Sequence, residues 1–131
     1  MSLCARLGTQ AASGWNSELK GPYYQHNVNR YIVLPGLRGV GKTTILYQCY
    51  EYLLKEKNFN SSDLLYISCE TTNFAGQTDI KKIIGIYLDK IHNTTPALLD
   101  KPVFIFIDEA HFDENWAMNG KTLYDESPYI F

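Results

Sequence analysis

A glycine-rich segment that directly follows an apolar run constrains the fold of this 131-residue chain more than any other feature. Residues 36–43 read Gly-Leu-Arg-Gly-Val-Gly-Lys-Thr, which matches the Walker A pattern. In such a loop the backbone N–H groups turn toward phosphate oxygens, the lysine reaches the β- and γ-phosphates, and the hydroxyl group ligates Mg²⁺. The sequence therefore predicts a phosphate-binding loop that consists of Gly36, Leu37, Arg38, Gly39, Val40, Gly41, Lys42, Thr43 and Thr44.

The residues on either side of this loop favour the same interpretation. Residues 31–34 are apolar and predict a buried strand, which Pro35 and Gly36 would end. From Thr44 to Leu54, apolar residues recur at the spacing of a helix. A phosphate site of this type needs the order strand, glycine loop and helix, because the anion lies at the positive end of the helix dipole.

A second apolar run, residues 103–107, ends in two carboxylates, Asp108 and Glu109, and is typical of a Walker B strand. In open parallel sheets ligands bind beyond the carboxyl ends of the strands, so we expect both motifs to face one crevice. An alternative stays open, in which the glycine turn is purely structural and the two acidic residues cap or begin a helix.

Hydrolysis of ATP requires that charge on the phosphates is neutralised and that a water molecule is directed at the γ-phosphorus. We expect Lys42 and Mg²⁺ to neutralise the charge, with Thr43 and Asp108 as metal ligands, the latter directly or through a water. We expect Glu109 to orient or polarise the attacking water as a general base. Lys42 and Glu109 are thus the predicted catalytic residues.

Three further residues near the motifs carry weaker indications. Arg38, inside the loop, could approach phosphate or pair with an acidic neighbour. His111 could couple the nucleotide state to a moving element, or serve as a surface or capping residue. Trp116 is expected to be a packing anchor, since tryptophans usually bury a large area.

The composition fits one folded domain without a membrane segment. Hydrophobic residues make up 45% of the chain and aromatic residues 14%, which is enough to fill a core. The formal net charge is −2 and the basic residues are scattered, so nucleic acid is not indicated as a partner. No apolar stretch approaches the roughly 20 residues of a membrane span. The N-terminus also lacks a signal-like apolar region, so we expect a cytoplasmic location.

The chain divides into a loosely ordered lead-in, residues 1–29, and a P-loop core, residues 30–131. Alternating patterns in the core predict an α/β fold with a mostly parallel sheet. The expected elements are a strand at 31–34, a helix from 42 to about 57, a strand at 64–68, a helix at 78–92 with Thr78 as N-cap, and a strand at 103–107. The second helix is expected to bury one face that consists of Ile80, Ile83, Ile84, Tyr87, Leu88 and Ile91.

Residues 128–131 are expected to begin another strand. A parallel sheet that stops at this point leaves apolar faces and edges uncovered, so we expect a fragment of a longer protein. The alternative is a complete small protein that is closed by dimerisation.

A resemblance to the AAA-superfamily ATPases of archaea and bacteria is carried by residues 34–46, 65–68 and 106–111, with Trp116 and residues 121–125. It is closest to members in which an AAA core precedes a C-terminal domain of uncharacterised role, and it covers about residues 30–131. The resemblance implies a three-layer P-loop core in which Glu109 is catalytic and a polar sensor residue ends the next strand. That strand, the lid and any arginine finger would follow the present chain. Leu37 stands where the family often has proline.

The expected function is to bind Mg²⁺-ATP and, in the full-length parent, to hydrolyse ATP in order to drive or gate a partner or output domain. ATP is favoured over GTP because the chain contains no Asn-Lys-x-Asp segment. Residues 108–111, Asp-Glu-Ala-His, also spell a helicase tetrad, so a helicase or translocase fragment is one alternative. A nucleotide-dependent switch that does not hydrolyse ATP is the other. Self-association of the full-length protein is a further expectation.

Overall fold

The computed structural model describes residues 30–37 and 39–131. The expected lead-in, residues 1–29, and Arg38 lie outside the described residues. The helices and strands in chain order are α2 (Lys42–Lys55), β1 (Leu64–Ser68), α3 (Cys69–Ala75), α4 (Ile80–His92), β2 (Phe104–Asp108) and α5 (Trp116–Glu126), and the short 3-10 helices are η2 (Ser61–Asp63), η3 (Pro96–Leu98) and η4 (Ala110–Phe112). No helix in the described part of the chain has the length and apolar character needed to cross a membrane.

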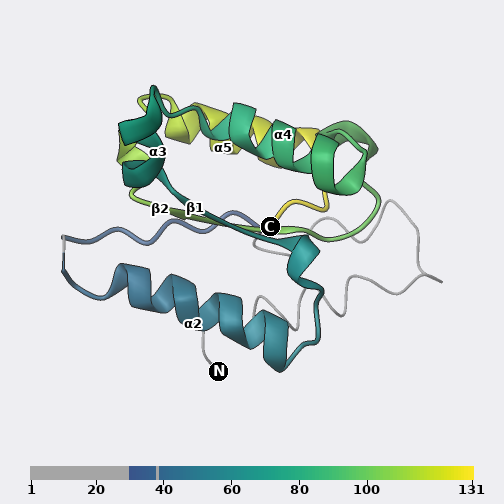
Figure 1. Cartoon of the computed structure of the whole chain (residues 1–131), viewed down its shortest axis with the longest axis horizontal. Helices are drawn as coiled ribbons and strands as arrows, with labels where there is room; N and C mark the ends of the chain where they lie inside the picture. The colour runs from purple at the N-terminus through teal and green to yellow at the C-terminus, as the bar shows by residue number, and fades with distance from the viewer. Residues whose placement is uncertain (1–29, 38) are drawn as a thin grey trace.

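The strands β1 and β2 form a parallel sheet that lies between two layers of helices (Figure 1). In Figure 1, α2 covers one face of the sheet, and α4 and α5 lie together over the other face. The register runs from Leu64 opposite Phe104 to Ser68 opposite Asp108, so both strands end at the same edge. The fold is therefore α/β with a parallel sheet, as the alternating apolar pattern predicts.

Side chains of β2 fill the core on both faces of the sheet. Phe104 and Phe106 pack on the side of α2, where they contact a cluster that includes Leu53. Ile105 and Ile107 pack on the opposite side, against the cluster that contains the buried residues of α4. Burial on both faces explains why β2 is a continuous apolar run and not an alternation of apolar and polar residues.

The buried face of α4 follows the prediction over most of its length. The residues of this helix that are buried are Ile80, Ile84, Tyr87 and Leu88. Ile91 was expected on the same face but is 54% exposed, because it lies in the last turn, outside the apolar cluster that packs against α4.

The N-cap of α4 is Asp79, so the prediction of Thr78 is wrong. The Asp79 carboxylate accepts a hydrogen bond from the backbone N–H of Lys82 at 3.0 Å, as an N-cap does. Thr78 is buried one residue earlier, where its hydroxyl donates to the backbone carbonyl of Cys69 at 3.2 Å. Thr78 thus contacts a residue nine positions earlier, which the helical pattern does not show, and α4 begins at Ile80.

No strand forms at residues 31–34 in the described structure, so this prediction is wrong. The edge of β2 that faces away from β1 is occupied by the end of the chain. There Val103 and Ile130 form a parallel bridge, and the N–H of Ile105 donates to the carbonyl oxygen of Phe131 at 2.8 Å. Residues 128–131, where a strand was predicted to begin, thus form an isolated bridge and not a strand, and they occupy the edge of β2 at Val103 and Ile105.

Contacts with α5 nevertheless fix the position of the segment that was expected to be a strand. The guanidinium group of Arg30 donates to the carbonyl oxygen of Ser127 at 2.6 Å and lies 4.1 Å from the ring centre of Tyr124. Tyr31 passes so close to α5 that a Cβ atom on Gly120 would lie 2.5 Å from the Tyr31 hydroxyl. The absence of a side chain at Gly120 therefore makes room for the Tyr31 ring.

The remaining differences concern element ends and two helices. Helix α2 ends at Lys55, short of residue 57, and β2 covers residues 104–108 in place of 103–107. The sequence does not predict α3 or α5. Helix α3 has only seven residues, and α5 buries only Leu123 among its own residues. Neither helix has the apolar periodicity by which a helix is identified from sequence.

Candidate nucleotide site

The glycine loop leads into a helix start that is open to an anion. Gly39 and Gly41 have φ angles of 84° and 91°, in the left-handed region that glycine adopts without strain. Gly41 is the N-cap of α2 and has no side chain with which to cap the first N–H groups of the helix. These N–H groups and the helix dipole favour a negative charge at this position.

The Lys42 side chain folds back over the loop. Its ammonium group donates a hydrogen bond to the carbonyl oxygen of Gly36, at the beginning of the motif. The variable positions Leu37 and Val40 are 82% and 59% exposed, and Thr44 is exposed as well. The ammonium group of Lys42 therefore lies within the loop, whereas the apolar side chains of the loop are open to solvent.

Thr43 and Asp108 are in contact although 65 residues separate them in the sequence. The Thr43 hydroxyl donates to Oδ2 of Asp108 at 2.8 Å. Thr43 lies in the first turn of α2 and Asp108 is the last residue of β2. The two motifs thus meet at the carboxyl edge of the sheet, where open α/β folds bind their ligands.

The charge of Asp108 has no cationic partner within residues 30–37 and 39–131, because no ion pair in this part of the chain involves it. Asp108 is only 8% exposed, and the donors that reach its carboxylate are neutral hydroxyl groups. A buried carboxylate is costly unless its charge is compensated. Mg²⁺ is typically held by one or two carboxylates together with phosphates and water, so Asp108 and Thr43 form a donor set that fits this ion.

Tyr66, which no sequence motif marks, also contacts Asp108. Its hydroxyl donates to Oδ2 of Asp108 at 2.7 Å, and its ring stacks on that of Tyr47 with 4.9 Å between the ring centres. Burial, and next the hydrogen bond to Asp108, raises the pKa of Tyr66 well above its ordinary value of 10.0. In the sequence Tyr66 looks like any residue of an apolar strand, because its contact with Asp108 depends on the register of β1 and β2.

Glu109 has a backbone conformation that is unusual for its residue type. Its φ and ψ angles are 54° and 45°, and it is the N-cap of η4. Left-handed backbone costs a residue with a side chain about 1 kcal/mol or more, and such residues cluster at functional sites. The Glu109 carboxylate lies 3.4 Å from Nδ1 of His111, whose side chain is 67% exposed. His111 is therefore a surface residue that forms an ion pair with Glu109 when it is protonated.

Asp113 is a buried carboxylate that the sequence motifs do not reveal. It is 2% exposed and accepts hydrogen bonds from the backbone N–H groups of Ile80 at 2.9 Å and Asn115 at 2.8 Å, and from the Asn119 amide at 3.0 Å. Burial alone would raise the pKa of Asp113, but these hydrogen bonds outweigh it and hold the pKa below its ordinary value. Asp113 thus ties the loop after β2 to the start of α4. In the sequence, Asp113 is marked only by the spacing Asp-x-Asn, which is compatible with a local turn.

One cavity is bordered by four of the predicted site residues. It has a volume of about 360 Å³ and lies between residues 30–36 and β2. Gly36, Lys42, Asp108 and Glu109 all line it. Trp116 lines the same cavity and packs against the cluster that contains the buried residues of α4. It is therefore a packing anchor, as predicted. Phosphate-loop, metal-ligand and general-base candidates therefore border a single space.

Comparison with known proteins adds a family and one relative. Residues 28–131 match the profile of a protein family described as AAA domain. An uncharacterized protein of Methanocaldococcus jannaschii is 29% identical over 104 residues, which cover 79% of this chain and 20% of that protein. The chain thus spans about one fifth of the length of this relative. No solved structure matches the chain.

Proposed function

We propose that this chain, which belongs to the AAA domain family, binds Mg²⁺-ATP at residues 36–44 and that its full-length parent hydrolyses ATP. Family membership establishes a nucleotide-binding domain of the ATPase type. The observation that best supports the finer proposal is the hydrogen bond of 2.8 Å between Thr43 and Asp108. It brings the two expected metal ligands together beside the phosphate loop.

The loop and the start of α2 would hold the phosphates. Gly41 leaves the first N–H groups of α2 open, and the helix dipole adds a positive potential at this point. Lys42 would exchange its hydrogen bond to Gly36 for the β- and γ-phosphates. Both contacts offset the negative charge that the phosphates carry during phosphoryl transfer.

Asp108 and Thr43 would hold Mg²⁺, which neutralises phosphate charge and orients the γ-phosphate when it is bound. The physical reason is the uncompensated carboxylate at the end of β2. A divalent cation would supply the countercharge that no described side chain gives to Asp108.

Glu109 would orient the attacking water and accept its proton. Its left-handed backbone turns the chain directly after Asp108, so that two adjacent carboxylates have different surroundings. Glu109 lines the same cavity as Lys42, and His111 lies 3.4 Å from its carboxylate. This division of tasks matches the requirement for one metal ligand and one general base.

Calorimetric titration of the chain with ATP and GTP in the presence of Mg²⁺ tests the binding proposal. We expect ATP to bind, and Lys42→Ala to weaken binding at least tenfold, because the substitution removes the positive charge that would contact the phosphates. Lys55→Ala is the matched control, since Lys55 lies at the other end of α2 and, among the residues that the structure describes, forms an ion pair with exposed Glu51 alone. Equal ATP affinity in Lys42→Ala and the parent chain would contradict the assignment of the site.

Phosphate release by the full-length parent tests hydrolysis. We expect Glu109→Gln to keep ATP affinity within about twofold and to abolish turnover, because it removes the base and keeps the shape. Tight binding without turnover in the parent would support the alternative of a nucleotide-dependent switch.

The role of the longer protein is part of the proposal. Because the chain spans 20% of its relative, we propose that the AAA core precedes a further C-terminal domain, as in the archaeal and bacterial ATPases that the sequence resembles. Hydrolysis would drive or gate that domain or a partner, in the cytoplasm, with self-association of the full-length protein.

The Asp-Glu-Ala-His tetrad alone supports the helicase alternative, and its test is ATP turnover that rises when single-stranded nucleic acid is added.

A further inference from the structure

Tyr66 connects three elements of the fold at a single carboxylate oxygen. It lies in the middle of β1, its ring stacks on Tyr47 of α2 with an interplanar angle of 23°, and its hydroxyl lies 2.7 Å from Oδ2 of Asp108 at the end of β2. The ring of this β1 residue therefore packs on a helix while its hydroxyl group reaches the neighbouring strand. Such a contact costs little side-chain entropy, because packing already fixes the ring.

We infer that Tyr66 is a positioning residue for Asp108 and thereby sets the Mg²⁺ affinity of the nucleotide site. This inference rests on the proposed function. Tyr66 and Thr43 donate to the same oxygen, Oδ2 of Asp108, at 2.7 and 2.8 Å. In residues 30–37 and 39–131 no hydrogen bond reaches Oδ1, so this oxygen is left to the cation or to a water bound to it.

The two donors to Asp108 have different anchors. Thr43 belongs to the phosphate loop and would ligate the cation itself, so its hydroxyl serves two partners once the nucleotide binds. Tyr66 belongs to the sheet and is not expected to ligate the cation. It therefore keeps the carboxylate in one orientation before and after binding, which is what hydrogen-bonding partners of metal ligands do in general.

The test is Tyr66→Phe, which keeps the stacked ring and removes only the hydroxyl. ATP affinity is measured by calorimetry with Mg²⁺ and again with EDTA. The Mg²⁺ gain is the ratio of the ATP affinity with Mg²⁺ to the ATP affinity with EDTA. We expect this ratio to be about tenfold smaller in the variant than in the parent chain. The ATP affinity in EDTA should stay within about twofold of the parent. Tyr50→Phe is the matched control, because it removes a hydroxyl from a ring that packs against Phe106; we expect no change in either affinity.

A double variant separates positioning from a general packing effect. In the Asp108→Asn background, Tyr66→Phe should change the ATP affinity less than twofold, because the group that Tyr66 positions is no longer a carboxylate. Two results overturn the inference and leave the proposed function standing. One is a Mg²⁺ gain in Tyr66→Phe that equals that of the parent chain. The other is a loss of ATP affinity on Tyr66→Phe that is the same in the Asp108→Asn background as in the parent chain. A parent chain with the same ATP affinity in Mg²⁺ and in EDTA overturns both.

Discussion

The two ends of the sheet each carry a buried aspartate, and the two residues have opposite surroundings. Asp63 precedes β1 and is 7% exposed, and Asp108 ends β2 and is 8% exposed. Asp63 is surrounded by side chains that can carry positive charge, whereas Asp108 receives only hydroxyl groups from the described residues. The two carboxylates are thus equally buried, but only the charge of Asp63 is compensated by cationic side chains among the described residues.

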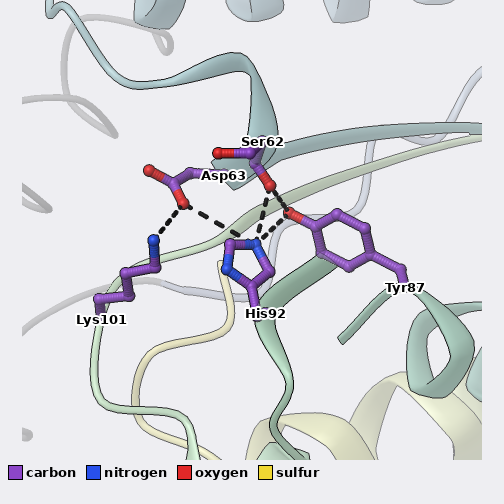
Figure 2. Close-up of polar contacts among 5 residues, drawn as sticks. All are labelled: Ser62, Asp63, Tyr87, His92 and Lys101. Atoms are coloured by element: carbon purple, nitrogen blue, oxygen red, sulfur yellow. Dashed lines mark hydrogen bonds and ion pairs between the residues drawn. The ribbon is translucent and has the colours of Figure 1, made fainter. Parts of the chain in front are cut away.

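Figure 2 shows the group of side chains at the Asp63 end. The ammonium group of Lys101 lies 2.9 Å from Oδ1 of Asp63, and Nε2 of His92 lies 3.8 Å from the same oxygen. His92 is also 2.8 Å from the carbonyl oxygen of Ser62, to which the Tyr87 hydroxyl donates. Burial, and next the charge of Asp63, raises the pKa of Tyr87 above its ordinary value. The group joins η2, α4 and the segment before β2.

The comparison indicates how a buried carboxylate becomes structural or functional. A charge that the protein itself compensates leaves little for a ligand to add, and the fold loses stability when one partner of the pair is removed. A charge that only neutral groups approach remains attractive to a cation from solution. The same residue type at two ends of one sheet therefore takes on different tasks. The following variants test this difference, from the largest expected effect to the smallest.

Asp108→Asn should separate binding from stability. We expect the Mg²⁺-dependent part of ATP affinity to fall about a hundredfold, because the metal ligand loses its charge. The free energy of unfolding should stay the same or rise by up to about 1 kcal/mol, because an uncompensated buried charge is removed. Calorimetry and urea denaturation measure the two quantities. A clear loss of stability would show that the carboxylate at this end is structural as well.

Asp63→Asn should give the reverse result. We expect the free energy of unfolding to fall by about 2 kcal/mol, less than for a fully buried pair because the Lys101 side chain is 39% exposed. ATP affinity of the folded chain should not change. Asp89→Asn is the matched control, since its ion pair with Lys90 is exposed, and it should cost less than about 0.5 kcal/mol. Equal effects of the two variants would refute the compensated pair at Asp63.

Asp113 supplies a third case, in which backbone and amide donors compensate the charge in place of a cation. Asp113→Asn should lower the free energy of unfolding at pH 7 by about 1 kcal/mol, because it replaces one of the two oxygens that accept from the N–H groups of Ile80 and Asn115. The pKa of Asp113 in the folded state lies below its ordinary value. Its contribution to stability is therefore present above the unfolded-state pKa of about 3.9 and is lost as the pH falls through the folded-state pKa.

Denaturation curves at a series of acid pH values check this sign. The parent chain should lose stability more steeply than Asp113→Asn below about pH 4. Parallel curves for the two proteins would mean that the Asp113 carboxylate does not stabilise the folded state.

The smallest expected effect concerns Cys69, which is fully buried beside these carboxylates. Burial, and next the charges of Asp113 and Asp108, raises the pKa of the Cys69 thiol to about 11. At pH 8 we expect iodoacetamide to modify Cys69 only as fast as the chain unfolds, because the thiolate is the reactive form. Mass spectrometry of the Cys69 peptide measures the rate. Rapid modification of the folded chain would mean that this part of the core opens locally.

Local sequence patterns predict those parts of the fold that depend on neighbouring residues. The apolar runs at β1 and β2 and the helical spacing of α2 and α4 appear in the structure with small shifts at their ends. The pattern at residues 31–34 also indicates a strand, but a strand needs a partner, and residues 31–34 pair with no strand among the described residues. Pairing between distant segments is not encoded in the local period.

The same distinction holds for the site. The motifs indicate Lys42, Thr43 and Asp108, and the structure brings the last two within 2.8 Å of each other. Their chemical roles stay predictions. Tyr66 and Asp113 carry no motif, because their contacts join residues that lie 42 and 33 positions apart. Sequence patterns identify residues whose chemistry is repeated among proteins, whereas supporting residues are identified only from the packing of this fold.

The unpaired segment at residues 31–34 also has a consequence for how the chain behaves in concentrated solution. Tyr31, Ile32 and Val33 are 43%, 36% and 51% exposed. Among the described residues no strand pairs with this segment, and an extended apolar segment of this kind is a template for β-pairing between molecules. The chain should therefore self-associate increasingly as its concentration rises, and charged substitutions such as Val33→Lys should improve its solubility.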